Sequence, residues 1–309
     1  MTERFLPAFG PWDIGATLTT LGHHSIPGAH RTDTTRGTHS RVLAVGGGHH
    51  IIDLRLTPAG VHWRVSGHAR AAGVPDESAL EPLLRWWFDL DAEIETIDAH
   101  LRGDPLLAGQ VADRPGIRIT RHPDAAAGVL TTILGQQVSL AAGRTFAGRL
   151  AAVYGDETGA GLRAFPAPAR LAAVDGEDLR AAIGLTGARA RTLREAAALL
   201  AEHPAPPDAP YLLAEDMLTR LADLPGVGPW TISILALRGR GEGDALPASD
   251  LVLRRAMGGL TAPAVTTAAE AWRPHRGYAV VRLWAGAGAA DGGFPVELVG
   301  GRAPADQAP

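Results

Sequence analysis

The part of this sequence that decides the fold is a short turn rich in glycine and proline, Leu224-Pro225-Gly226-Val227-Gly228-Pro229-Trp230-Thr231. Before it, residues 214–224 place apolar side chains at the three- and four-residue spacing of a helix. Pro225 and Gly226 end that helix, and Pro229 suits the first position of a second one. The stretch therefore predicts two helices joined by a hairpin, with the second helix over residues 230–238.

The two glycines of the hairpin predict a site for a phosphate group. Gly226 and Gly228 can adopt positive φ, and without Cβ atoms they let a bulky group approach the backbone. The start of the following helix adds unpaired amides and a partial positive charge. We expect the amides of Gly226, Gly228 and Trp230 to bind an anion. An ordinary corner between two helices would have a similar sequence, so the turn alone assigns no function.

Asp250 lies beyond the second helix and opens another helical segment. As the N-cap of that segment it would accept a hydrogen bond from a backbone amide, and many Asp residues at such positions do no more. Here, however, a helix of suitable length connects the acid to the hairpin. The combination of a phosphate clamp and a lone carboxylate at a fixed offset makes Asp250 a candidate catalytic residue.

Several motifs in the same order resemble one protein family. The hairpin and Asp250 look like those of the helix-hairpin-helix DNA glycosylase superfamily, and most of all like the 3-methyladenine DNA glycosylase II branch, the AlkA type. Residues 133–139, 165–172 and 272–284 resemble further motifs of this family. The resemblance extends from about residue 80 to 285. It implies an enzyme that cuts a damaged base from DNA.

The resemblance implies a specific role for Asp250. Breaking an N-glycosidic bond moves positive charge onto the sugar, and a nearby carboxylate stabilises that charge. The implied partner is double-stranded DNA containing damaged bases. The implied substrates are alkylated purines of the 3-methyladenine and 7-methylguanine type. Such a base already carries a positive charge and leaves readily, so a single carboxylate suffices.

The resemblance also implies a base pocket, in which this chain departs from the family. Trp230 and Trp284 match the two tryptophans of the family's pocket. Ile234 and Leu251 stand where the familiar enzyme has tyrosines, and Leu18 replaces a phenylalanine. A flipped base is held between aromatic or apolar walls, and fewer aromatic faces weaken the attraction for a cationic base. Hypoxanthine and ethenoadenine therefore remain alternative substrates.

Two glutamines are expected to face the DNA. Gln136 and Gln137 lie in the stretch of residues 133–139 that resembles the DNA-facing helix and loop. Gln137 stands where the familiar enzyme inserts a leucine wedge into the gap left by the flipped base. It could fill that gap, or it could be an ordinary exposed residue at a helix end. Thr231, next to the hairpin, is expected to contact DNA as well.

The residue types that are absent restrict the chemistry. The sequence contains no lysine and no cysteine. Family members that also nick the strand use a lysine amine, at the position of Trp230 here, and an arginine stays protonated and cannot replace it. We therefore expect a monofunctional glycosylase that leaves an abasic site. A four-cysteine iron–sulfur cluster is excluded, and no cofactor is expected, although a monovalent cation in the hairpin remains open.

Composition and charge fit a globular DNA-binding protein with local basic patches. The chain has 309 residues, a net charge of −4, 46% hydrophobic and 20% charged residues. We expect a monomeric, cytoplasmic, nucleoid-associated bacterial protein with no signal peptide and no membrane segment. Because the whole chain is not basic, DNA affinity must come from local arginines. The candidates are Arg189, Arg191, Arg194, Arg238, Arg240, Arg254 and Arg255.

The predicted fold class is α+β, mostly α. We expect an N-terminal domain over residues 1–102 with a small antiparallel sheet and helices, similar to the TBP-like domain of AlkA-type enzymes. A helical body with two lobes should follow. One lobe, residues 125–242, carries the hairpin; the other, residues 103–124 and 243–290, carries Asp250. Residues 291–309 are expected to be disordered.

Local patterns predict the individual elements. Strands are expected over residues 41–45, 51–56 and 61–65, with a hairpin loop at 57–60. Helices, besides those around the hairpin and at residues 272–284, are expected over 12–21, 78–101, 125–134, 140–154, 168–173, 176–182, 188–202 and 267–272.

Two other classes of protein remain possible on the sequence alone. A hairpin-based DNA-binding protein without chemistry would need neither Asp250 nor two pocket tryptophans. A helical protein with an unrelated role would need no hairpin. The histidine pairs at residues 23–24 and 49–50 do not predict a metal site, because neither has cysteine partners or helical His spacing.

Overall fold

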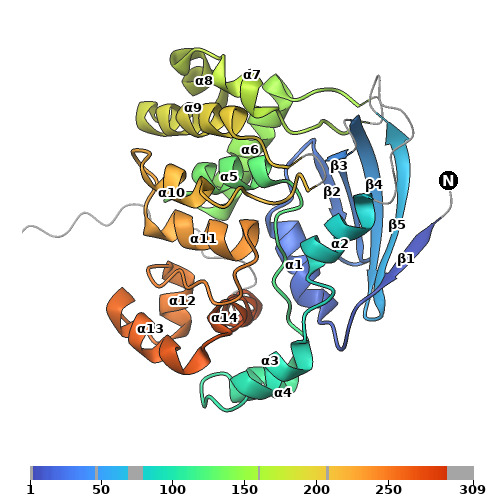
Figure 1. The fold of residues 1–309 in the computed structure, drawn as a ribbon, viewed down its shortest axis with the longest axis vertical. Coiled ribbons are helices and arrows are strands. Elements are labelled where there is room, and N and C mark those ends of the chain that lie inside the picture. Colours follow the sequence, from blue (N-terminus) through green and yellow to red (C-terminus); the bar gives the residue numbers. More distant parts are fainter. Residues whose placement is uncertain (1–2, 46–47, 69–78, 159–160, 207–208, 291–309) are drawn as a thin grey trace, which may run out of the picture.

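The fold is α+β and mostly α, as predicted, with an antiparallel sheet on one side and a helical body on the other (Figure 1). A segment predicted to be disordered, residues 291–309, lies outside the described residues. The computed structural model describes residues 3–45, 48–68, 79–158, 161–206 and 209–290.

The sheet has five antiparallel strands in the order β1-β5-β4-β3-β2. The three predicted strands form the centre of the sheet. Each extends beyond the residues that were predicted for it. Thr57 pairs with Gly60, which confirms the predicted hairpin loop. The strands are β1 Arg4–Pro7, β2 His30–Asp33, β3 Thr38–Val45, β4 Gly48–Thr57 and β5 Gly60–His68.

The sequence did not predict β1 and β2, which form the two edges of the sheet. In β1 only Leu6 is buried, and β2 has no fully buried residue. An edge strand pairs on one side only and buries little apolar surface, so it lacks the alternation that marks the central strands.

Two helices pack beside the sheet, and both differ from their predicted bounds. Helix α1, Ile14–His23, begins two residues later than expected because the Asp13 carboxylate caps it, accepting from the Ala16 amide at 2.9 Å. The prediction of one helix over residues 78–101 is wrong. Asp89 adopts a left-handed φ of 54°, which ends α2, Leu80–Phe88, before α3, Ile94–Leu101, begins.

The remaining helices form the body, and most begin and end within two residues of their predicted bounds. The segment predicted as a helix over residues 267–272 is instead the end of α13 followed by a 3₁₀ turn. The helices are α4 Ala108–Asp113, α5 Ala125–Leu134, α6 Leu140–Tyr154, α7 Pro168–Ala172, α8 Gly176–Ile183, α9 Gly187–Glu202, α10 Met217–Ala222, α11 Pro229–Gly239, α12 Leu251–Ala256, α13 Ala262–Ala268, the 3₁₀ turn Ala269–Trp272 and α14 Arg276–Ala290.

The helical body contains two hydrophobic cores. Helix α11 belongs to both: Leu235 is buried in the core with α5 and α9, and Leu237 in the core with α12 and α14. Ile97 of α3 packs in the second core, although the predicted boundary at residue 102 placed α3 with the sheet. Because α11 packs in both cores, the hairpin before it and the acid after it are held in one rigid arrangement.

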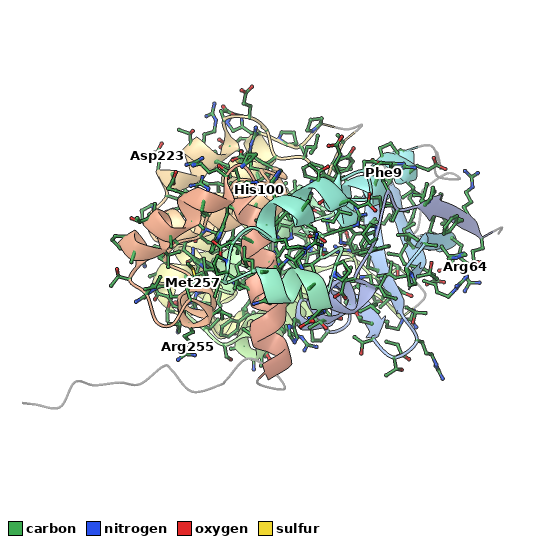
Figure 2. All side chains as sticks on the ribbon, turned by 90° about the horizontal axis from the view of Figure 1, so that it is seen from below. Phe9, Arg64, His100, Asp223, Arg255 and Met257 are labelled. Atoms are coloured by element: carbon green, nitrogen blue, oxygen red, sulfur yellow. The ribbon has the colours of Figure 1, made fainter. Side chains whose placement is uncertain are left out.

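The sheet and the C-terminal lobe lie on opposite sides of the molecule. Figure 2 shows Phe9 and Arg64 on the side of the sheet, and Arg255 and Met257 on the side of α12. Within the described ranges, no helix is both long enough and apolar enough to cross a membrane.

Candidate active site

The hairpin between α10 and α11 forms as predicted, but its two glycines do different things. Gly226 has a φ of +88°, and a Cβ there would meet the Thr192 hydroxyl at 2.9 Å. That hydroxyl donates to the Pro225 carbonyl at 2.7 Å and fixes the turn against α9. Gly228 has a φ of −103°, so only Gly226 uses the positive φ that both glycines allow.

Gly228 instead leaves the start of α11 open. A Cβ at this position would have no atom within 4 Å, and the residue is the N-cap of a helix without a side-chain cap. The first amides of a helix have no intrahelical partners. The hairpin therefore presents an uncovered helix N-terminus, the geometry that binds a phosphate. Pro229 at the first helical position removes one possible donor.

The carboxylate of Asp250 accepts three hydrogen bonds. One oxygen, Oδ1, accepts from the Leu253 amide at 2.8 Å, so Asp250 is the N-cap of α12. The same oxygen accepts from Trp284 Nε1 at 2.9 Å, and Oδ2 accepts from Trp230 Nε1 at 2.9 Å. Donors on α11, α12 and α14 thus fix the orientation of one half-buried carboxylate.

The two tryptophans therefore have a role that the sequence did not predict. They were expected as walls of a base pocket, yet the indole N–H of each donates to Asp250. A charge-assisted hydrogen bond to each oxygen restrains the rotation of the carboxylate. Spacing along the chain could not reveal this, because Trp284 lies on a helix that packs against α12 only in the tertiary structure.

Of the three other predicted pocket residues, Ile234 and Leu251 lie next to the site in sequence and Leu18 lies in the core beside the sheet. Ile234 lies one turn after Trp230 on α11 and is buried. Leu251 follows Asp250 and is exposed, with 47% of its surface accessible. Leu18 is buried in the core between the sheet and α2. The place of these three side chains in a base pocket remains a prediction.

The two glutamines that were predicted to face DNA lie in the turn after α5. Hydrogen bonds with neighbouring helices fix this turn. Gln136 Nε2 donates to the Thr231 hydroxyl at 2.7 Å, and Arg189 of α9 donates to the Gln136 carbonyl. Gln137 is exposed and adopts a φ of +52°. Thr231 itself is buried, so its side chain supports the turn and is not available to DNA. The structure thus presents Gln137 on a fixed turn.

The arginines around Asp250 do not form one basic patch. Arg240 pairs with Glu242 at 3.0 Å, Arg254 donates to the Leu260 carbonyl, and Arg255 is exposed. Arg238 is half-buried, with its guanidinium carbon 5.5 Å from the centre of the Trp284 ring. Burial lowers the pKa of Arg238 to about 10, while the charge of Asp250 acts in the opposite direction.

No candidate metal centre accompanies this site. Within the parts of the chain that the structure describes, no group of three or more His, Cys, Asp or Glu side chains is placed to hold a metal ion. The chemical groups at the site are a fixed carboxylate, two indole donors, an arginine and an open helix N-terminus.

Two curated proteins with DNA repair names are similar to this chain. A probable bifunctional transcriptional activator/DNA repair enzyme AlkA of Mycobacterium tuberculosis is 36% identical over 293 residues, which cover 90% of this chain and 56% of the relative. DNA-3-methyladenine glycosylase 2 of Escherichia coli is 34% identical over 175 residues, 56% of this chain and 61% of the relative. The chain thus spans somewhat more than half the length of these curated relatives.

Solved structures share the fold over nearly the whole chain. A 3-methyladenine DNA glycosylase from Archaeoglobus fulgidus aligns with a TM-score of 0.71 at 19% identity, covering 92% of this chain and 97% of that one. An 8-oxoguanine glycosylase/lyase of Clostridium acetobutylicum, solved with double-stranded DNA, aligns with a TM-score of 0.69 at 16% identity, covering 93% and 98%.

Two family descriptions match consecutive parts of the chain. Residues 4–124 match the AlkA N-terminal domain, which contains the sheet. Residues 130–271 match the description HhH-GPD superfamily base excision DNA repair protein. These residues include the hairpin and Asp250. The chain therefore belongs to the AlkA type of the HhH-GPD superfamily of base excision DNA repair proteins.

Proposed function

We propose that this protein is a monofunctional DNA glycosylase of base excision repair. It flips a damaged purine out of double-stranded DNA and hydrolyses the N-glycosidic bond, leaving an abasic site. The observation that carries the proposal is the carboxylate of Asp250, oriented by two indole donors and placed one helix away from a phosphate-binding hairpin. A protein that only bound DNA would have no use for an oriented carboxylate at this place.

Asp250 acts on the sugar in this mechanism. As the C1′–N9 bond breaks, its electron pair stays with the base and positive charge develops on the sugar. At about 4 Å and an effective dielectric of about 20, a carboxylate stabilises a unit positive charge by roughly 4 kcal/mol, about a thousandfold in rate. Water then adds to C1′ and gives up a proton. The indole donors restrain the carboxylate before the charge forms, so little reorganisation is needed.

The monofunctional character rests on the sequence and the position of Trp230. The chain has no lysine, and the residue expected at the position of a lyase's amine, Trp230, donates to Asp250. Without a lysine amine, no Schiff base between a side chain and the sugar can form. Borohydride trapping with lesion-containing duplex tests this: we expect no covalent adduct through a side chain, and an adduct would contradict the proposal.

DNA binding follows from the hairpin and from the turn that carries Gln137. The open N-terminus of α11 holds a phosphate, and the exposed Gln137 enters the gap left by the flipped base. We propose that no resident cofactor takes part. A monovalent cation bound by hairpin carbonyls stays a prediction, tested by comparing DNA affinity in potassium and tetramethylammonium salts of equal ionic strength.

The damaged base belongs to one of two chemical classes. Alkylated purines such as 3-methyladenine and 7-methylguanine are cationic in DNA, whereas hypoxanthine and ethenoadenine are neutral. The relatives named for 3-methyladenine favour the first class. The aliphatic side chains of Ile234 and Leu251, where the family has aromatic rings, favour the second.

A panel of duplexes tests the proposed function directly. Each duplex contains 3-methyladenine, 7-methylguanine, ethenoadenine, hypoxanthine or uracil, and the released free base is measured by chromatography. We expect release of at least one purine lesion and an intact strand until the abasic site is cleaved by alkali. Binding to every duplex without release of any base would identify a non-catalytic DNA-binding protein instead.

A further inference from the structure

The turn between α5 and α6 contains a residue in an unusual backbone conformation. In residues 135–138, which we call the wedge turn, Gln137 has a φ of +52°. A residue with a Cβ adopts this left-handed conformation at an energetic cost, and it keeps it only where neighbouring contacts hold it. Because Gln137 is exposed, the contacts that hold the wedge turn act on the residue before it.

Gln136 is held by two hydrogen bonds from opposite ends of the residue. Its carbonyl, which belongs to the peptide bond leading into Gln137, accepts from the guanidinium of Arg189 on α9. Its side-chain amide donates to the Thr231 hydroxyl at 2.7 Å. The bond to the carbonyl fixes the peptide plane that precedes Gln137, and it thereby restrains the φ of that residue.

Helix α9 contacts the wedge turn and the hairpin through two side chains. Arg189 lies in the first turn of α9 and binds the Gln136 carbonyl, and Thr192 donates to the Pro225 carbonyl of the hairpin at 2.7 Å. Residues three apart lie on the same face of a helix. The helix also packs against α5, which ends at the wedge turn (Figure 1). One face of α9 thus fixes the position of the wedge turn relative to the hairpin.

Arg189 brings a charged donor to this carbonyl. Burial lowers the pKa of Arg189, but an arginine stays protonated at neutral pH. Within the described ranges, no carboxylate forms an ion pair with its guanidinium. A hydrogen bond from a charged donor is stronger than one from a neutral donor. The half-buried guanidinium is therefore well suited to hold a strained turn.

We propose that Arg189 is a positioning residue for filling the gap that a flipped base leaves in DNA. It holds the Gln136 carbonyl and so keeps Gln137 in the conformation from which its side chain enters the gap. The inference rests on the proposed glycosylase function and on the proposed wedge role of Gln137. Arg189 acts only through the wedge turn and contacts neither the sugar nor the base.

A direct contact between Arg189 and a DNA phosphate would affect binding differently. A phosphate contact carries no information about the base, so its loss weakens binding to intact and damaged duplexes alike. A positioning residue stabilises only the complex in which the gap exists, so its loss weakens binding to DNA with a gap. The loss also has no further effect once the wedge side chain itself has been removed.

The experiment measures affinity for two duplexes by fluorescence anisotropy at one salt concentration. One duplex contains a tetrahydrofuran abasic-site analogue, and the other is undamaged and otherwise identical. The proteins are wild type, Arg189→Met, Arg189→Lys, Gln137→Ala, the double variant of Arg189→Met with Gln137→Ala, and Arg180→Met. Arg180→Met is the control on the neighbouring helix α8, because Arg180 is exposed and pairs with Glu177 at 2.8 Å.

We expect Arg189→Met to weaken binding to the abasic-analogue duplex about fivefold and binding to the undamaged duplex less than about twofold. The double variant should bind the abasic-analogue duplex no more weakly than Gln137→Ala alone. Arg189→Lys keeps a charged donor and should stay within about twofold of wild type. Arg180→Met should bind both duplexes as wild type does.

Two results would overturn the proposal. Equal weakening on both duplexes in Arg189→Met would identify a phosphate contact instead. Losses that multiply in the double variant would show that Arg189 acts independently of Gln137. Thermal unfolding checks that each variant folds. If Arg189→Met does not fold, the same comparison is made with Arg189→Gln, whose shorter side chain loses the bond but keeps a polar group at this half-buried position.

The outcomes also separate this inference from the proposed function. If wild type releases no base from any lesion of the panel, the glycosylase function fails. If wild type releases bases and Gln137→Ala binds the abasic-analogue duplex as tightly as wild type, the glycosylase function stands. The wedge role of Gln137 and the positioning role of Arg189 then fail together.

Discussion

The indole N–H of Trp230 donates to Oδ2 of Asp250 at 2.9 Å, and this bond joins the first turn of α11 to the N-cap of α12. The hairpin that is proposed to bind phosphate and the acid that is proposed to act on the sugar are therefore connected by a single side chain. A shift of the hairpin on DNA would be transmitted to the carboxylate through this bond.

Loss of either indole donor should slow base release. In Trp230→Phe and Trp284→Phe the ring remains and the N–H is removed. A hydrogen bond to a charged group contributes about 1.5–3 kcal/mol, so we expect each variant to lose at least about tenfold in single-turnover rate. Affinity for a duplex with a stable abasic-site analogue serves as the control and should change little. Equal rates in wild type and both variants would mean that the bonds do not orient Asp250.

The two hairpin glycines should respond differently to a methyl group. At Gly226, Ala would face positive φ and the Thr192 hydroxyl, so Gly226→Ala should destabilise the protein by about 1–2 kcal/mol. At Gly228 the φ is ordinary and the space is open, so Gly228→Ala should fold normally. Its methyl group would stand where the phosphate approaches, and DNA affinity should fall. Thermal unfolding and fluorescence anisotropy measure the two effects separately; a Gly228→Ala protein with wild-type affinity would place the phosphate elsewhere.

Gln137 should act through its side chain. Its exposed position and left-handed backbone present the amide outward. Gln137→Ala should weaken binding to the abasic-analogue duplex by about fivefold, the loss of roughly 1 kcal/mol. Gln137→Gly separates the causes, because glycine adopts positive φ without strain. If glycine restores affinity, the backbone conformation matters and the wedge role is wrong; if both variants are equally weak, the side chain fills the gap.

Buried histidines should make the protein sensitive to acid. Burial, aided by the charge of Arg41, lowers the pKa of His39 from 6.5 to about 3. The unfolded chain takes up a proton as the pH falls through about 6.5, while the folded protein does not. Stability should therefore fall by up to about 1.4 kcal/mol per pH unit from this group between pH 6.5 and 3. Urea unfolding across this range tests the slope. His39→Phe should reduce it, and an unchanged slope would assign the acid sensitivity to other groups.

Much of the fold could be predicted because local signals and tertiary structure agree. Helices α5 and α6 match their predicted bounds, since each has a side-chain N-cap, Asp124 and Ser139, before an apolar pattern. The break at Asp89 could not be predicted. Its left-handed backbone is held by tertiary contacts, to Arg121 at 2.6 Å and to the Tyr278 hydroxyl at 2.8 Å.

The residues of the site were predicted from the sequence, but the hydrogen bonds between them were not. Pattern and resemblance singled out Asp250, Trp230 and Trp284 from three different helices. That both indoles would donate to one carboxylate depends on how α14 packs against α12, which no local spacing encodes. Arg238 was expected only as one of several basic residues, and its position over Trp284 follows from the same packing.

The measurement that tests the central claim most directly is base release by Asp250→Asn under single-turnover conditions. Asn is also a favourable N-cap, so α12 should keep its start, and unchanged affinity for the abasic-analogue duplex would show that the DNA surface is intact. We predict a loss of about a thousandfold in the rate of base release, because the negative charge beside the sugar is gone. A variant that folds, binds DNA and releases bases within a few-fold of the wild-type rate would contradict the assignment of Asp250 as the catalytic carboxylate.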